Sequence, residues 1–186
     1  MYIHSMKEVT KGRKIVDLDE PDMLLVPLFE HFGSKPEAIV EIGDRVLKYQ
    51  VIGKSHEGLS APVHSPVSGV VEKIEKIKQL NGSDAATVFI KNDGLNDEMA
   101  NPLPAIDTDS SEELLQLIND AGIVGMGGAQ FPAATKYNRK GKKVKTFIIN
   151  GAECEPYLTS DYGLMKGYTR EVLEGILLAD KMLDAE

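Results

Sequence analysis

The sequence contains a single cysteine, Cys154, among its 186 residues. One cysteine cannot form an internal disulfide, and it excludes a cysteine-held metal cluster within these residues. No apolar run reaches the ~18 residues of a membrane-spanning helix. The N-terminal stretch MYIHSMKEVTKGRK also lacks the apolar segment of a signal peptide. These absences predict a cytoplasmic protein that does not insert into a membrane.

Histidines are few and scattered. His4, His31, His56 and His64 have no spacing typical of metal ligands, so we assign no metal site. No histidine lies near Cys154 in the sequence, and we therefore expect that cysteine to be a small packing residue rather than a nucleophile. The sequence assigns no catalytic side chain.

The formal net charge of −8 argues against a general nucleic-acid-binding protein. The charge is unevenly distributed, because residues 136–145 (KYNRKGKKVK) contain six basic residues and no acidic one. This run is either a solvated turn or a local attractor for a phosphate-bearing ligand or acidic partner. The sequence leaves both interpretations open.

Residues 1–100 have the pattern of an all-β unit. Short stretches rich in valine and isoleucine recur at close spacing, and Gly43-Asp44 and Asn81-Gly82 supply turn signals between them. The Asn81-Gly82 pair predicts a hairpin that joins residues 70–80 to residues 85–92. Many short strands with few helical patterns are typical of a small sandwich or barrel.

Residues 101–186 have an α/β pattern after a proline-containing linker. Ser110 and Glu113 form the pattern of a capping box, and Gly122 occupies the place of a helix C-cap glycine. Pro132 would open a second, short helix. Residues 145–150 (KTFIIN) predict a buried strand. The final helix is amphipathic, with apolar residues on one face at Val172, Ile176, Ala179 and Leu183.

The stretch GMGGAQFP, residues 125–132, joins these two predicted helices and has glycine at 125, 127 and 128. It is neither a strand–GxGxxG–helix motif nor a P-loop. Glycines allow backbone N–H groups to approach a flat or phosphorylated ligand, and the Lys136 ammonium one turn later could reach a phosphate. Alternatively, the glycines only permit a tight turn between helices.

A second polar cluster, INGAECEPYLTSD (149–161), directly follows the predicted strand. Asn150 offers an amide. In an extended segment Glu153 and Glu155 would project to the same face, because side chains two residues apart do so. Such carboxylates could accept hydrogen bonds from a ribose or a ring N–H. Two solvated loop acids are the alternative interpretation.

These two motifs, in this order, resemble RnfC, a subunit of the Rnf electron-transport complex. Both are also similar to motifs of the NADH- and FMN-binding subunit of respiratory complex I. In the first half, YIHSMKEVT and VEIGDRVLKYQVIG…SAPVHSPVSGVV resemble the start and the biotinyl/lipoyl-like domain of RnfC proteins. The resemblance covers nearly the whole chain.

The resemblance implies two domains. Residues 1–100 would form a barrel-sandwich hybrid, and residues 101–186 would form the first part of a Rossmann-like α/β domain, truncated at residue 186, that binds FMN and NADH. By the same resemblance one group of residues would bind these cofactors: Gly125, Gly127, Gly128, Ala129, Phe131, Lys136, Asn150, Glu153 and Glu155. In this group Phe131 would lie near the nicotinamide nucleotide.

The implied activity is electron transfer from NADH through FMN to 4Fe-4S clusters of a membrane complex, or in reverse from ferredoxin to NAD. The clusters are expected only beyond these residues, so this fragment alone would be inactive. The implied partners are NADH and other subunits of the complex, on the inner face of the cell membrane. Two alternatives stay open: a soluble RnfC-like reductase, of cobalamin or donating to an amino-acid reductase, and a non-catalytic docking module.

The sequence departs from the family pattern at three positions. Gln130 stands where most relatives have the third glycine of Gly-Ala-Gly-Phe-Pro, and a side chain there could narrow the pocket or alter nucleotide specificity. Tyr49 also replaces a usual glycine, in a predicted surface turn. Ala152 stands where the complex I subunit has an aspartate.

Overall fold

The computed structural model describes residues 4–185 except residues 30, 32, 80–81, 101–105 and 127–128. The chain divides into two compact units. The β-rich unit is Glu20–Asn138, and the helical unit combines Met1–Asp19 with Arg139–Glu186. The N-terminal segment therefore belongs to the same unit as the C-terminal helices.

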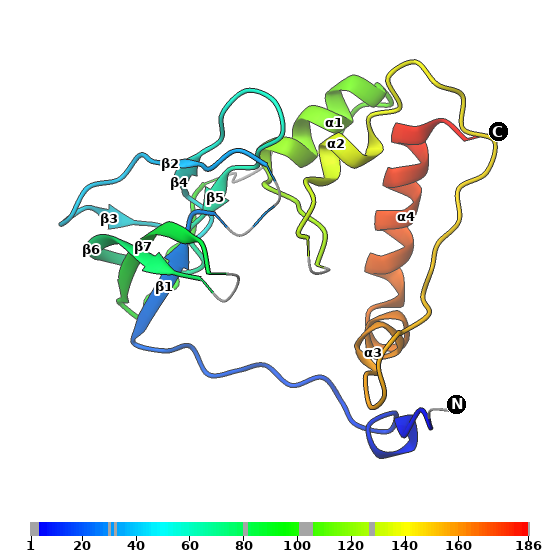
Figure 1. Cartoon of the computed structure of the whole chain (residues 1–186), viewed down its shortest axis with the longest axis horizontal. Helices are drawn as coiled ribbons and strands as arrows, with labels where there is room; N and C mark the ends of the chain where they lie inside the picture. Colours follow the sequence, from blue (N-terminus) through cyan, green and yellow to red (C-terminus); the bar gives the residue numbers. More distant parts are fainter. Residues whose placement is uncertain are drawn as a thin grey trace. The chain divides into compact units, whose positions relative to one another are not determined.

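The β-rich unit contains two antiparallel sheets (Figure 1). One has four strands in the order β1-β7-β6-β3, and the other has three strands in the order β2-β4-β5. The strands are β1 (Met23–Pro27), β2 (Glu37–Ala38), β3 (Arg45–Val46), β4 (Val51–Lys54), β5 (Val63–His64), β6 (Gly69–Lys78) and β7 (Asp84–Asn92). The all-β pattern predicted for the first half is confirmed.

An apolar core lies within this unit. Its fully buried members come from both sheets and include Val46, Ile52, Val71, Val88 and Ile90, each with 0% of its surface exposed. Burial of one such side chain contributes about 1.5–3 kcal/mol, so the core is the main source of stability for the β-rich unit.

Two predicted turns are present. Strands β6 and β7 pair as a hairpin, in which Gly82 has a φ of +83° and Gln79 N–H donates to Ser83 O. Asn81 of the predicted turn lies outside the described residues. At the other turn Gly43 has a φ of +96°, and Asp44 N–H donates to Glu41 O at 3.1 Å.

Two helices end the β-rich unit, α1 (Ser111–Asp120) and α2 (Ala133–Tyr137). Ser110 Oγ accepts from Glu113 N–H at 3.4 Å, Gly122 follows the C-cap with a φ of +66°, and Pro132 is the N-cap of α2. The predicted helix boundaries are confirmed. The Ser110 N–H, however, donates to Thr108 Oγ1 at 3.0 Å and not to the Glu113 carboxylate. Only the Ser110 half of the predicted capping box is therefore formed.

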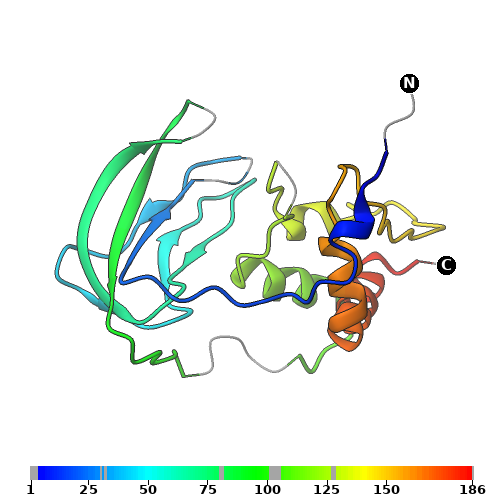
Figure 2. The same cartoon turned by 90° about the horizontal axis from the view of Figure 1, so that it is seen from below.

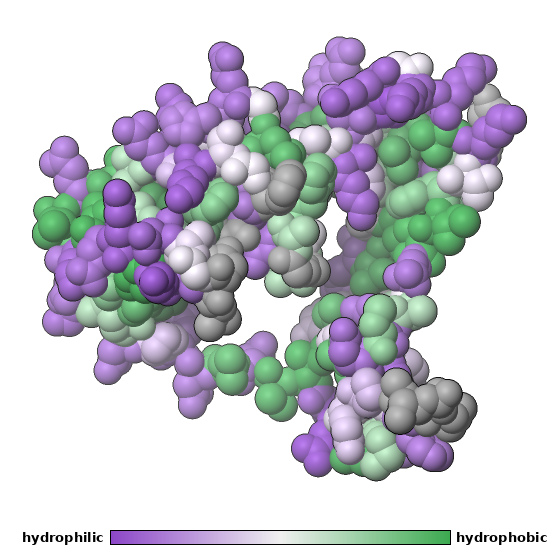
Figure 3. Space-filling model, in the orientation of Figure 1, coloured by the Kyte–Doolittle hydropathy of each residue, from purple (hydrophilic) through white to green (hydrophobic). Residues whose placement is uncertain are grey.

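The helical unit contains the short 3-10 helix η1 (Lys7–Val9), α3 (Ser160–Gly167) and α4 (Thr169–Leu183). The amphipathic pattern predicted for α4 is confirmed: Ala179 is buried, and Val172, Ile176 and Leu183 are half-buried. Figure 3 shows hydrophobic side chains along α4, in agreement with the 53% and 63% exposure of Leu173 and Leu177. None of the described helices is long and apolar enough to cross a membrane.

The strand predicted over residues 145–150 is wrong. These residues form coil, and Ile148 is 78% exposed. A strand needs a neighbour that accepts and donates its backbone hydrogen bonds. The described part of the helical unit has only helices and irregular segments, so residues 145–150 have no strand with which to pair.

Candidate functional site

The glycine loop between α1 and α2 is closed at its base by backbone hydrogen bonds. Val124 and Pro132 form an isolated antiparallel bridge. Gly125 N–H donates to Phe131 O, and Ala133 N–H donates to Ile123 O, both at 2.9 Å. These hydrogen bonds therefore hold the two ends of the loop together between α1 and α2.

The described part of this loop is open to solvent. Met126 is 97% exposed, and Gly125 and Ala129 are also exposed. A Cβ on Gly125 would meet only the Phe131 backbone, at 3.7 Å. Gly127 and Gly128 lie outside the described residues. The accessible backbone at Gly125 is available to a ligand.

Two other predicted residues lie close by in the sequence. Phe131 is half-buried at the end of the loop. Lys136 lies in the only turn of α2, where it is exposed, and its Nζ lies 5.9 Å from the centre of the Tyr137 ring. The structure thus places Gly125, Ala129, Phe131 and Lys136 in one unit, on one helix–loop–helix element.

Gly122, at the start of this segment, has a different role. A Cβ on Gly122 would lie 2.5 Å from Pro62 O and 3.1 Å from Nδ1 of His64. Burial lowers the pKa of His64, although a hydrogen bond to the Asp120 backbone partly opposes this effect. The tight-turn interpretation therefore holds for Gly122, whereas Gly125 has free space around it.

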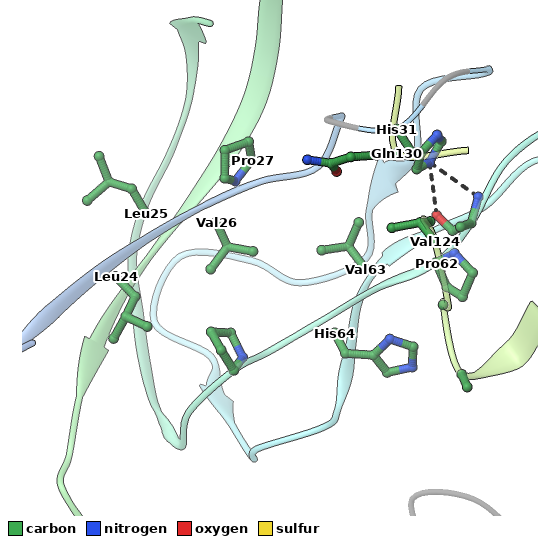
Figure 4. Close-up of a pocket in the computed structure, with 14 residues that line it drawn as sticks. Leu24, Leu25, Val26, Pro27, His31, Pro62, Val63, His64, Val124 and Gln130 are labelled. Atoms are coloured by element: carbon green, nitrogen blue, oxygen red, sulfur yellow. Dashed lines mark hydrogen bonds between the residues drawn. The ribbon is translucent and has the colours of Figure 1, made fainter. Parts of the chain in front are cut away.

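A pocket of about 520 Å³ lies beside the loop (Figure 4). Strand β1 supplies an apolar wall through Leu24, Leu25 and Val26, and His31, His64 and Gln130 supply polar groups. Nε2 of His31 lies 3.2 Å from both the N and the O of Ala61, which fixes the imidazole ring.

The second predicted motif lies in the helical unit. Asn150 is exposed, and its Oδ1 accepts from Ala152 N–H at 2.9 Å. Glu153 has a side chain only 5% exposed, whereas Glu155 is exposed. The two carboxylates therefore differ in exposure, because Glu153 has partners in the N-terminal segment and in α3.

The Glu153 carboxylate stabilises the start of α3 and its contact with the N-terminal segment. Its Oε1 accepts from Asp161 N–H at 2.8 Å in the first turn of α3, where a carboxylate also interacts favourably with the helix dipole. Its Oε2 lies 3.7 Å from Lys7 Nζ, and Lys7 Nζ also donates to Glu153 O at 3.2 Å.

The N-terminal segment makes further contacts with the same region. Tyr157 N–H donates to Ser5 O at 2.9 Å, and Thr10 Oγ1 donates to Tyr157 O at 2.7 Å. The sequence pattern did not predict these contacts, because they join residues about 150 positions apart and leave no local signal. The N-terminal segment therefore holds the Asn150–Glu155 motif in place.

The expectation for Cys154 is wrong, because the thiol is exposed instead of packed. Its neighbour Glu153 is the residue of this segment whose side chain is buried, with 5% exposed. Within the described ranges, no group of three or more His, Cys, Asp or Glu side chains could hold a metal ion. In the basic run, Arg139 Nη1 pairs with Asp184 Oδ2 at 2.9 Å.

Two family models match the chain. The RnfC barrel sandwich hybrid domain matches residues 1–95, about half of the sequence. The chain belongs to the RnfC family. The Nuo51 FMN-binding domain matches residues 118–186, which include the glycine loop and the Asn150–Glu155 motif.

Curated RnfC relatives match over most of this chain. The C subunit of the ion-translocating oxidoreductase complex is 40% identical over 184 residues in Haemophilus influenzae (strain Rd) and 40% identical over 175 residues in Rhodobacter capsulatus. The C subunit of the Na(+)-translocating ferredoxin:NAD(+) oxidoreductase complex of Acetobacterium woodii is 36% identical over 170 residues. These alignments cover 97%, 91% and 90% of this chain, but only 22%, 34% and 38% of the relatives.

The two residues that depart from glycines expected by the family resemblance stand at positions of left-handed backbone. Gln130 has a φ of +43°, and Tyr49 has a φ of +70°. Tyr49 lies in a tight turn in which Gln50 N–H donates to Leu47 O at 3.1 Å. Left-handed backbone costs a non-glycine residue roughly 1–2 kcal/mol, which is a physical reason for glycine at both positions.

Proposed function

We propose that this chain is part of an RnfC-type electron-transport subunit that binds FMN and NADH. Electrons would pass from NADH through FMN to 4Fe-4S clusters, or from ferredoxin to NAD in the reverse direction. The support is the order of the two matched domains and the names of the relatives, which are subunits of oxidoreductase complexes. FMN, when bound, converts the two-electron chemistry of NADH into single-electron steps.

The observation that carries this proposal is the exposed glycine loop, held at its base by backbone hydrogen bonds. Gly125 leaves room for a ligand beside its backbone, and Ala129 is also exposed. By the family resemblance Gly127 and Gly128, which lie outside the described residues, would bind the same cofactor. Lys136 has no ion-pair partner among the described residues and would bind the FMN phosphate. The residues present fit a flat, phosphorylated cofactor, and Phe131 would lie near the nicotinamide ring.

In the second motif, we assign contact with the nucleotide to Asn150 and Glu155. Both side chains are exposed, and the Asn150 amide keeps its N–H groups while its Oδ1 accepts from Ala152. Glu153 would act by positioning the motif, since its carboxylate is already engaged by Asp161 N–H and Lys7. The domain that contains these residues would be Rossmann-like, as in the complex I relatives.

The remaining parts of the proposal concern the whole subunit. Residues 1–100 would form the barrel-sandwich domain and residues 101–186 the first part of the flavin domain. The partners would be other subunits of the complex, with the protein peripheral on the inner face of the cell membrane. The 4Fe-4S clusters would be held outside residues 1–186.

FMN titration of the intact protein tests the site. We expect Lys136→Glu to weaken FMN binding about ten-fold or more, because the variant removes a charge-assisted contact and adds a repulsion. Lys142→Glu, an exposed lysine of the same basic run, is the matched control and should bind FMN normally. Equal FMN affinity in the two variants would discard the phosphate role of Lys136.

The docking-module alternative is tested in the same titration. It is favoured by Gly122, whose packing against Pro62 shows that one glycine of this segment has a purely structural role. If the intact protein, with Gly127 and Gly128 unchanged, binds no FMN, then the docking alternative holds and our assignment of the flavin site fails.

A further inference from the structure

The helical unit contains a second pocket, of about 460 Å³, that neither predicted motif includes. It lies between the N-terminal segment at residues 11–15 and the region of α3, which are neighbours in both Figure 1 and Figure 2. Its lining includes four cationic side chains and two tyrosines: Lys11, Arg13, Lys14, Lys166, Tyr162 and Tyr168.

The charge of this pocket has one sign. Four lining residues, Lys11, Arg13, Lys14 and Lys166, are cationic and none is acidic, in a chain with a formal net charge of −8. In the part of the chain that the structure describes, these four cations form no ion pair with a carboxylate. Gathered cations repel one another, and a bound anion relieves that repulsion.

The cations surround an aromatic ring. Lys11 Nζ lies 5.4 Å and Lys166 Nζ lies 5.8 Å from the centre of the Tyr162 ring. Tyr168 is 44% exposed at the same pocket. Two tyrosine rings offer surfaces against which a planar group can stack.

The backbone of the pocket is also accessible. A Cβ on Gly12 or on Gly167 would meet nothing within 4 Å, so a ligand can approach both segments closely. A volume of about 460 Å³ lies within the range of roughly 300–1,000 Å³ that is typical of small-molecule sites.

We propose that this pocket binds a nucleoside phosphate. The phosphate would accept charge-assisted hydrogen bonds from the four cations, and the base would stack on Tyr162. This site shares no residue with the proposed flavin and NADH site, and the inference does not rest on the proposed function.

Calorimetric titration of the intact, FMN-saturated protein with AMP tests the proposal. The pocket variant Lys11→Gln/Lys166→Gln removes the two ammonium groups beside Tyr162. The control variant Lys142→Gln/Lys145→Gln makes the same change of charge at two exposed lysines outside the pocket. We expect AMP to bind about ten-fold or more weakly to the pocket variant and normally to the control.

A third variant, Tyr162→Leu, separates the ring from the charge. It should weaken the binding of AMP but leave the binding of inorganic phosphate unchanged, because only AMP has a ring to stack. The variants Glu155→Gln and Lys136→Glu should both keep the AMP affinity of this pocket. Their behaviour distinguishes a failure of this proposal from a failure of the flavin assignment.

Four results of the calorimetric titrations would overturn the proposal. They are no AMP binding at millimolar concentration, equal affinity of the pocket and control variants, loss of AMP binding in Glu155→Gln, and loss of phosphate binding together with AMP binding in Tyr162→Leu. Binding of the protein to anionic phospholipid vesicles is measured in a separate experiment. If vesicles bind through Lys11 and Lys166 and AMP does not displace them, the site recognises a lipid headgroup and not a nucleoside phosphate.

Discussion

A Cβ on Gly122 would lie only 2.5 Å from the carbonyl oxygen of Pro62. The backbone at Gly122, just after α1, thus packs closely against the backbone of Pro62, just before β5. In β5 itself, the His64 side chain is hydrogen-bonded to the backbone of Asp120, the last residue of α1. Because the glycine loop begins three residues after Gly122, this contact anchors the start of the loop to the strands of its own unit.

Gly122→Ala should therefore destabilise the β-rich unit more than an alanine in left-handed backbone does elsewhere. Gly94→Ala is the matched control, because Gly94 has a φ of +68° and a Cβ there would meet nothing within 4 Å. We expect a loss of about 1 kcal/mol for Gly94→Ala from the backbone alone, and about 1–3 kcal/mol more for Gly122→Ala from overpacking. Equal losses in urea unfolding would contradict the close contact.

At position 130 the reverse change, from a side chain to glycine, tests the cost of left-handed backbone. Gln130→Gly should be neutral or stabilise the chain by up to about 1 kcal/mol, since relief of left-handed strain outweighs or balances the greater freedom of glycine in the unfolded state. Gln130→Val should destabilise it by about 1–2 kcal/mol, because β-branched residues tolerate positive φ poorly. Thermal unfolding followed by circular dichroism measures both; a less stable glycine variant would show that the Gln130 side chain itself contributes.

The stability of the β-rich unit should depend on pH through His64. Its folded-state pKa is lowered from 6.5 by burial, so its contribution is fully present above pH 6.5. That contribution is lost as the pH falls from 6.5 through the lowered pKa, because the unfolded state binds the proton first. Urea unfolding between pH 7.5 and 5 should show a smaller loss of stability in His64→Gln than in the wild type, and identical pH profiles would exclude this role.

Glu153 and Glu155 should respond differently to the same substitution. Glu153→Gln should lower the unfolding free energy by about 1–2 kcal/mol, because its buried carboxylate accepts from Asp161 N–H and pairs with Lys7. Glu155→Gln should leave stability unchanged but weaken NADH-driven flavin reduction in the intact protein. A Glu155→Gln variant with unaltered kinetics would make Glu155 an ordinary loop acid.

Features that depend on neighbouring residues could be predicted from the sequence, and features that depend on distant residues could not. Ser110, Gly122 and Gly43 were placed correctly because caps and turns depend on residues within a few positions. The strand predicted over residues 145–150 failed because an apolar run indicates burial, whereas a strand also needs a pairing partner. The spacing of Glu153 and Glu155 predicted that both project to one face, but spacing carries no information about Lys7, which lies 146 positions away and pairs with Glu153.

The sequence by itself determined the all-β first half, the boundaries of α1 and α2 and the family, because valine-rich patterns, caps and motif order are local features of neighbouring residues. It did not predict α3. Only the tertiary structure decided which glycine packs against Pro62, which carboxylate is buried, and that Lys11 and Lys166 lie beside one tyrosine ring. These features arise from contacts between distant segments, whose geometry exists only once the chain has folded.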